Sequence, residues 1–208
     1  MSRKHLEAQK DRMTYFISSV GRTDNMLSVN LRDADLDAAN FEGLFLFPSD
    51  FRGASLRNAN FRSTFLEGSN FSGADLEGAD FQGACLAAAN LRGLLSYTNF
   101  QEAYLPTADL QGAILFGANL VEANLDTANL QGADLGKTDI VEEIFPPANL
   151  RRATLRHANI QGANLRDVDL SCVDFWKADL RGADLSGSKL MEANLTHANL
   201  QGAVLLSR

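Results

Sequence analysis

The chain has 208 residues, of which 45% are hydrophobic and 22% charged, and its formal net charge at pH 7 is −7. Because nucleic-acid binders need a cationic face to displace counterions, this charge disfavours nucleic acid as a partner. No run approaches the roughly 18 apolar residues of a membrane span, and the N-terminus lacks the apolar region of a secretory signal. Two distant cysteines, Cys85 and Cys172, do not form a disulfide framework, so we expect a cytoplasmic protein.

The N-terminal residues differ in pattern from the rest of the chain. Leu6, Met13, Phe16, Ile17 and Val20 recur at near-helical spacing among Arg, Lys and Glu. This spacing predicts a short amphipathic α-helix. We assign residues 1–23 to a helical cap over the first coil of the repeat that follows, because the ends of a solenoid need covering.

From Leu31 onward, one large apolar residue recurs at every fifth position. The series runs from Leu31 to Leu91, takes a single four-residue step to Leu95, and continues to Leu205, always with Leu, Phe or Ile. The residue two places earlier is usually Ala, and the residue directly before is usually Asn or Asp. The unit is therefore A-(N/D)-L-x-x, often with Gly in the last place.

A period of five fits neither an α-helix nor an alternating β-strand. The large and the small residue of each unit must face the same interior, and the next residues must turn a corner, where Gly tolerates the required backbone. Asn and Asp side chains can bond the backbone at such turns. The sequence therefore predicts an all-β solenoid.

Two segments, residues 123–127 (ANLDT) and 183–187 (ADLSG), follow this unit closely. Here the chain resembles the pentapeptide-repeat family, which is abundant in cyanobacteria, and the resemblance covers about residues 24–206. It implies a right-handed quadrilateral β-helix with 20 residues per coil and about nine coils. We assign residues 24–208 to this single domain, with a register slip at 91–95.

If every fourth unit lies on the same side of the coil, one of the four sides has apolar residues in the place that normally holds Asn or Asp, directly before the large residue. Continuous counting puts Phe45, Phe65, Cys85, Tyr104, Asn124, Ile144, Asn164, Asp184 and Val204 there, with every proline nearby. An outward apolar stripe is typical of a protein contact. The alternative is that these side chains pack against neighbouring coils. The predicted interaction residues are Phe45, Phe47, Pro48, Phe65, Tyr104, Pro106, Ile144 and Pro146.

Residues 141–147 fit the repeat worst. Glu143 falls in an inward place, where an unpaired carboxylate is costly, so the backbone there should leave the coil. Residues 44–48 predict a milder distortion. The five-residue count survives both, which predicts no long inserted loop. On the other sides, counting predicts an arginine ladder (Arg32, Arg52, Arg92, Arg151), an acidic strip (Glu102, Glu122, Glu142) and scattered aromatic residues (Tyr97, Phe116, Trp176).

The sequence contains no recognisable catalytic constellation. His157 and His197 should share a side but lie two coils apart, ~10 Å, too far to bind one metal ion. Phosphate-binding loops, nucleophile elbows and Cys-x-x-Cys motifs are not found. We therefore expect no enzymatic activity, cofactor or metal.

Three functions remain open. The first is a scaffold that binds a protein partner of unassigned identity through the apolar side. The second, implied by the resemblance, is a DNA mimic of the quinolone-resistance type that acts on DNA gyrase, although a C-terminal helix and a clear loop insertion are missing. The third is a self-associating rod, a homodimer through an uncapped C-terminal coil that exposes Leu200, Leu205 and Leu206.

Overall fold

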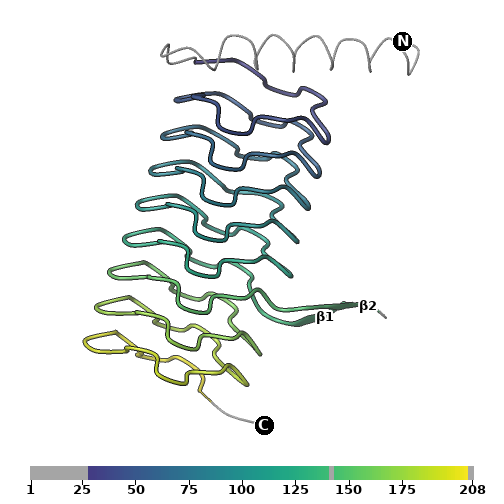
Figure 1. The fold of residues 1–208 in the computed structure, drawn as a ribbon. Coiled ribbons are helices and arrows are strands. Elements are labelled where there is room, and N and C mark those ends of the chain that lie inside the picture. Colours follow the sequence, from purple (N-terminus) through teal and green to yellow (C-terminus); the bar gives the residue numbers. More distant parts are fainter. Residues whose placement is uncertain (1–27, 141–142, 206–208) are drawn as a thin grey trace.

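The computed structural model describes residues 28–140 and 143–205, which wind as a four-sided coil around one apolar core (Figure 1). Each side of a coil contributes one residue that pairs in parallel with a residue of the next coil. The helical cap predicted for residues 1–23 lies outside the described residues, so the cap and the number of coils stay predictions. In the first described turn the pairs are Asn30–Asp50, Asp35–Ser55, Asn40–Asn60 and Phe45–Phe65.

Each corner is a tight turn that follows the large residue. At the first corner, the Ala34 N–H donates to the Leu31 carbonyl at 3.3 Å, and Asp33 between them has a φ of 55°. This left-handed backbone is the reason that Gly is frequent in that place. The Asn30 carboxamide oxygen accepts from the Arg32 N–H at 3.2 Å, which confirms the predicted turn role of Asn and Asp.

The sides are joined along the rod by backbone hydrogen bonds. The Leu31 N–H donates to the Asp50 carbonyl at 2.7 Å, and the Asp50 N–H donates to the Val29 carbonyl at 2.9 Å. The same pair of bonds recurs from coil to coil on all four sides. Backbone polar groups beside the apolar core are therefore satisfied without long strands.

Phenylalanine fills the core in the N-terminal half of the rod. Phe41 and Phe61 stack at 4.6 Å between ring centroids, and Phe51 and Phe71 form a second stack at 4.6 Å. The two stacks meet edge to face, with Phe51 and Phe61 at 5.7 Å. Phe rings thus make parallel stacks within a column and perpendicular contacts between columns, both favourable arrangements of aromatic rings.

The predicted register slip at 91–95 is confirmed. Asp75 pairs with Leu94 over 19 residues, and Leu94 pairs with Ile114, so the columns continue after one residue is lost. Gly93 lies at this corner, and a Cβ there would be 3.0 Å from the Ala74 carbonyl oxygen. The shortened corner therefore brings the backbones of two coils close together.

A β-hairpin interrupts the coil in its C-terminal half (Figure 1). β1 (Thr138–Ile140) and β2 (Glu143–Phe145) pair antiparallel and project from the side of the rod. The Ala148 N–H donates to the Leu135 carbonyl at 2.7 Å, which is the ordinary corner bond. The coil thus closes directly from residue 137 to residue 148, and residues 138–147 are an insertion.

The predicted departure from the coil is confirmed for residues 143–145, which belong to β2, but the expectation of no long insertion is wrong. Partners across the hairpin are 30 residues apart instead of 20, as for Asn129 and Asn159. The extra length equals two repeat units, so it leaves the five-residue count unchanged. Residues from 148 onward consequently lie two sides away from where continuous counting puts them.

This alignment predicts a specific engineered disulfide. With Cys85 and Cys172 replaced by Ser, the pair N124C and T154C should oxidise readily, because these residues are direct partners on adjacent coils. The control pair N124C and I144C, which continuous counting makes neighbours, should remain reduced because β2 lies outside the coil. Mass spectrometry of the two variants distinguishes the alignments, and the opposite result would overturn the insertion.

The corner at Pro48 shows the predicted milder distortion. Pro48 lacks the positive φ of most other corners, yet Phe45–Phe65 and Asp50–Asn70 stay paired on either side. The buried Ser69 hydroxyl accepts from the Ser49 N–H at 3.0 Å and donates to the Leu46 carbonyl at 3.2 Å. A side chain of the next coil thus satisfies backbone groups of this corner.

Ser69→Ala should therefore destabilise the rod more than its size suggests. The substitution removes a donor and an acceptor from buried backbone groups, for which the expected loss in the free energy of unfolding is about 1–3 kcal/mol. Ser72→Ala, at an outer turn position of the following corner, should change it by no more than about 0.5 kcal/mol. Denaturant unfolding measures both, and equal effects would contradict the role given to Ser69.

Candidate interaction surface

Four outward residues on one side of the coil form what we call the aromatic strip: Phe45, Phe65, Cys85 and Tyr104. They are successive pairing partners. The rings of Phe45 and Phe65 stack at 4.5 Å with planes 2° apart, and each is still 38% exposed, while Tyr104 is 49% exposed. Of the two alternatives from the sequence, each holds in part: the rings pack on one another and also face outward.

The corner next to the strip extends its apolar character. Phe47 is half-buried and Pro48 is exposed. Pro106 occupies the same corner further along, since its carbonyl accepts from the Ala88 N–H at 2.9 Å. Between Phe47 and Pro106 this corner carries small residues and one carboxylate, Glu67. The structure therefore brings together six of the eight predicted interaction residues.

The other two predicted residues, Ile144 and Pro146, do not lie on this surface. Ile144 belongs to β2, outside the coil. The Pro146 carbonyl accepts from the Gly117 N–H at 2.8 Å, at a corner across the rod from the aromatic strip. Their assignment was wrong because the insertion begins before them and counting in fives cannot detect it.

The same insertion changes which residues follow the strip. Its column continues through Asn124, Thr154, Asp174 and Asn194. The predicted Asn164, Asp184 and Val204 instead continue the opposite column through Asp134. Polar residues thus complete the column of the strip.

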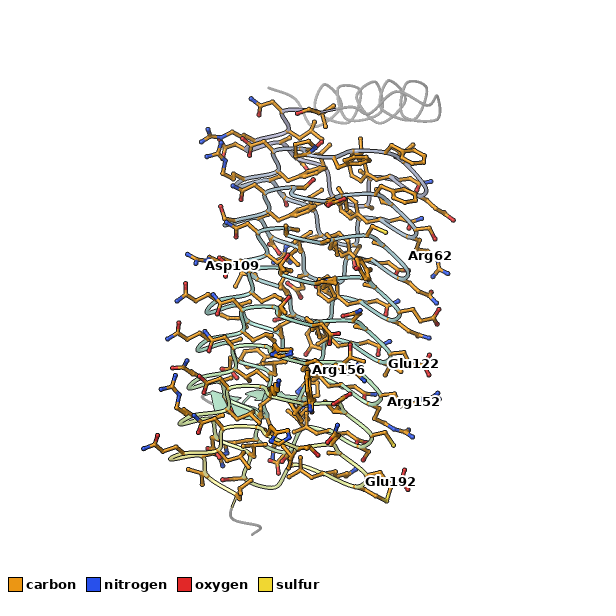
Figure 2. All side chains as sticks on the ribbon, turned by 90° about the vertical axis from the view of Figure 1, so that its left-hand side faces the viewer. Arg62, Asp109, Glu122, Arg152, Arg156 and Glu192 are labelled. Atoms are coloured by element: carbon orange, nitrogen blue, oxygen red, sulfur yellow. The ribbon has the colours of Figure 1, made fainter. Side chains whose placement is uncertain are left out.

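Charged and aromatic residues gather at the corner beside this polar part, where Figure 2 shows Arg156. The Arg156 guanidinium donates to the Asp174 carboxylate at 2.6 Å. Burial would raise the pKa of Asp174, but hydrogen bonds from Arg156, the Trp176 N–H and Asn194 outweigh it and hold this pKa below its ordinary value. His157 meets the Trp176 ring edge to face at 4.8 Å, and the Lys177 ammonium lies 4.2 Å from the centre of that ring.

A second apolar patch, which the sequence analysis missed, lies on the column opposite the strip. Leu94 and Tyr97 are 47% and 46% exposed, and Leu94 pairs with the half-buried Ile114. A Cβ on Gly117 would be 2.7 Å from the Tyr97 ring and 3.3 Å from Pro146. The available signal was that Leu94 and Ile114 occupy places that normally hold Asn or Asp. Counting predicts Tyr97 as one of several scattered aromatic residues, whereas the structure places it in an apolar patch with Leu94.

Two predicted charge patterns also change. Arg32, Arg52 and Arg92 share a corner, but Gln161 takes the place predicted for Arg151, and Arg181 follows one coil later. Glu102 and Glu122 lie at the same corner of adjacent coils, as the acidic strip predicts, but its continuation is wrong. The next residue after Glu122 is Arg152, which ion-pairs with it at 3.0 Å (Figure 2). Cations therefore interrupt the carboxylates on this edge.

Two of the three residues predicted to self-associate, Leu200 and Leu205, lie in the last described coil. Leu200 is half-buried and Leu205 is 52% exposed, while Leu206 lies outside the described residues. Leu190 and Leu195, at equivalent core places, are also only partly buried. Their exposure is compatible with self-association through this coil, which stays a prediction.

The residues that the structure describes contain no group of three His, Cys, Asp or Glu side chains able to hold a metal ion. Among the same residues, no helix is long and apolar enough to cross a membrane. Neighbouring carboxylates are instead used in turns and ion pairs, as with Asp50 and Arg52, where the guanidinium lowers the pKa of Asp50 to about 2.

The reactivity of Cys85 and Cys172 tests which neighbouring groups raise the pKa values of their thiols. The Glu192 carboxylate is the main cause that raises the pKa of Cys172, whereas burial is the main cause for Cys85, followed by Glu67. A raised pKa leaves less thiolate at a given pH and slows alkylation. Glu192→Gln should therefore accelerate maleimide labelling of Cys172 about two- to fivefold at pH ~8, and Glu67→Gln should accelerate Cys85 less. Equal acceleration would contradict these causes.

Comparison with known proteins agrees with the architecture. The family model for pentapeptide repeats matches in eight copies, over residues 54–93, 94–132, 107–140, 148–187 and 188–206. HetL, a pentapeptide-repeat protein involved in heterocyst differentiation regulation in the cyanobacterium Nostoc sp. strain PCC 7120, is 33% identical over 85% of this chain and 74% of its own, with a TM-score of 0.41.

Two further solved structures are similar. Rfr23 from the cyanobacterium Cyanothece 51142 is 30% identical over 61% of this chain and 63% of its own, with a TM-score of 0.24. QnrB1, a plasmid-mediated fluoroquinolone resistance protein, is 19% identical over 86% of this chain and 92% of its own, with a TM-score of 0.38. None of the curated proteins compared with the chain matches it. The chain belongs to the pentapeptide-repeat family, whose members fold as right-handed quadrilateral β-helices.

Proposed function

We propose that this chain is a non-enzymatic scaffold that binds a protein partner through the aromatic strip and the corner beside it. The exposed Phe45–Phe65 pair carries the proposal. A Phe side chain that points outward buries less apolar surface than one that points into the core. It also occupies a place where Asn or Asp would accept a hydrogen bond from the backbone of the turn. Large aromatic side chains on an outer surface are typical of contact anchors.

The size of the strip limits how much affinity it can provide. Covering the exposed parts of Phe45, Phe65 and Tyr104 would remove roughly 250 Å² of mostly apolar surface from water. At about 25 cal/mol per Å², this corresponds to about 6 kcal/mol before the cost of association. The strip can therefore anchor a partner, but stable binding needs further contacts on the same side.

The strip is also held rigidly, which favours binding. The Phe65 N–H donates to the Leu44 carbonyl at 2.9 Å, and the Leu46 N–H donates to the Phe65 carbonyl at 2.9 Å. Ring stacking further restricts Phe45 and Phe65. A partner would consequently lose little affinity to ordering of this surface.

The gyrase-directed DNA mimic stays a prediction that no observation favours. A protein that imitates DNA needs unpaired carboxylates along a surface. Here Arg57 pairs with Asp75 at 2.6 Å, Arg92 pairs with Asp109 at 2.7 Å, and Arg152 pairs with Glu122 at 3.0 Å. Ion pairs on several edges thus lower the negative potential that such imitation requires.

A double variant on the strip tests the proposed function. Phe45→Ser with Phe65→Ser should leave the rod folded and reduce the recovery of a specific partner from extract of the native cell at least about tenfold, since two anchors of about 2 kcal/mol each are lost. Quantitative mass spectrometry after affinity capture measures the recovery of each captured protein.

The opposite patch supplies a matched control. Leu94→Ser with Tyr97→Ser removes side chains of similar exposure from another column and should leave the recovery of that partner unchanged. If both double variants reduce recovery alike, or neither does, the aromatic strip is not the binding surface.

A further inference from the structure

The side that carries the aromatic strip changes its chemistry along the rod. Tyr104 pairs with Asn124, Asn124 with Thr154, and Thr154 with Asp174, so these residues form one continuous column. The corner beside this column carries Arg156, His157, Trp176 and Lys177, which we call the cationic cluster. It lies in line with Pro106, because the corner hydrogen bonds continue from Thr107 to Asp126, from Thr127 to Arg156, and from His157 to Trp176.

Within the cationic cluster, Lys177 is the cation left available to a ligand. The Arg156 guanidinium is bound to the Asp174 carboxylate at 2.6 Å, and the Arg156 backbone N–H donates to the Asp126 carboxylate at 3.0 Å. Lys177 makes no ion pair with any residue that the structure describes, and its ammonium lies over the Trp176 ring at 4.2 Å. Lys177 is exposed, and cation–π contact holds it in place without neutralising its charge.

Within the column, neutral residues separate Tyr104 from Asp174, while the corner between Pro106 and Arg156 carries one carboxylate, Asp126. Asn124 and Thr154 are half-buried, and Thr154 Oγ1 has no hydrogen-bond partner within the described residues. In the half that holds the strip, the column is apolar and its corner carries the carboxylate Glu67 but no cation. The side is therefore polarised, with apolar rings at one end and an available ammonium at the other.

We infer that the partner presents an extended segment whose apolar side chains cover the aromatic strip and whose acidic side chains reach Lys177. This inference rests on the proposed function and specifies its ligand. From Phe45 to Asp174 the column takes six steps between paired residues, or about 29 Å at ~4.8 Å per step. An extended segment of about nine residues spans this length.

The match in charge decides the chemistry of the segment. The chain carries a net charge of −7, so a basic partner would be attracted over much of its surface and would gain nothing specific at Lys177. An acidic segment is repelled elsewhere and attracted only where a cation is available. Lys177 thus fixes the direction in which the segment lies as well as adding a contact.

Synthetic peptides and the single Trp of the chain provide the experiment. The probe is a nine-residue peptide with Leu and Phe in its first half and Asp in its second, and the comparison peptide carries Lys in place of Asp. Anisotropy of labelled peptide measures binding, and Trp176 fluorescence reports whether the charged half reaches the cationic cluster. We expect the acidic peptide to bind about tenfold more tightly and to change the Trp176 emission, an effect that high salt weakens.

Two substitutions of lysine separate specific from general charge effects. Lys177→Gln should weaken binding of the acidic peptide about three- to fivefold, as expected for one exposed ion pair. Lys189→Gln, on a different column beside Asp169, should leave it unchanged. Equal binding of the two peptides, equal effects of the two substitutions, or no binding of the acidic peptide at about 1 mM would overturn the inference.

The strip variant distinguishes failure of the inference from failure of the proposed function. If Phe45→Ser with Phe65→Ser abolishes recovery of the native partner while Lys177→Gln changes neither that recovery nor peptide binding, the strip binds a protein but the acidic segment is wrong. If the strip variant leaves recovery unchanged, the proposed function fails whatever Lys177 does.

Discussion

The hydrogen bonds between successive coils are the interaction on which the rest of this structure depends. Each corner aligns the N–H and the carbonyl of a side along the rod, as for Leu31 and Asp50, so the backbone is satisfied whichever side chain points outward. The outward place then contributes one modest bond when it holds Asn or Asp, worth about 1 kcal/mol. The fold can therefore carry Phe45, Phe65 or Tyr104 there without losing the coil, and its outer columns are free to acquire binding surfaces.

Much of this fold is predictable because the period of five is a direct consequence of packing. A large residue such as Leu125 and a small one such as Ala123 must face the core in every unit, and both are fully buried. The slip at 91–95 is also visible in the sequence, since it changes the spacing by one. The hairpin is different: an insertion equal to two units alters no spacing, so counting cannot distinguish a projecting segment from half a coil.

Particular residues show where prediction of the surface ends. Glu143 and the adjacent prolines at 146 and 147 indicate that the chain leaves the coil, because an inward carboxylate and missing N–H groups conflict with it. The point of return is fixed only by the bond between the Ala148 N–H and the Leu135 carbonyl. The aromatic strip, which precedes the hairpin, was therefore predictable from the sequence. The position of Trp176 and Lys177 on the same side was not, because it depends on where the chain rejoins the coil.

The way the hairpin is inserted also constrains how this surface can change. Residues 138–147 leave and rejoin the coil at one corner, so a longer or shorter hairpin would keep Asn124 paired with Thr154. A single additional unit within the coil would instead rotate every later residue by one side and separate Lys177 from Tyr104. A surface that combines the aromatic strip with the cationic cluster thus depends on the number of units that remain in the coil, while the hairpin, across the rod, is free to vary.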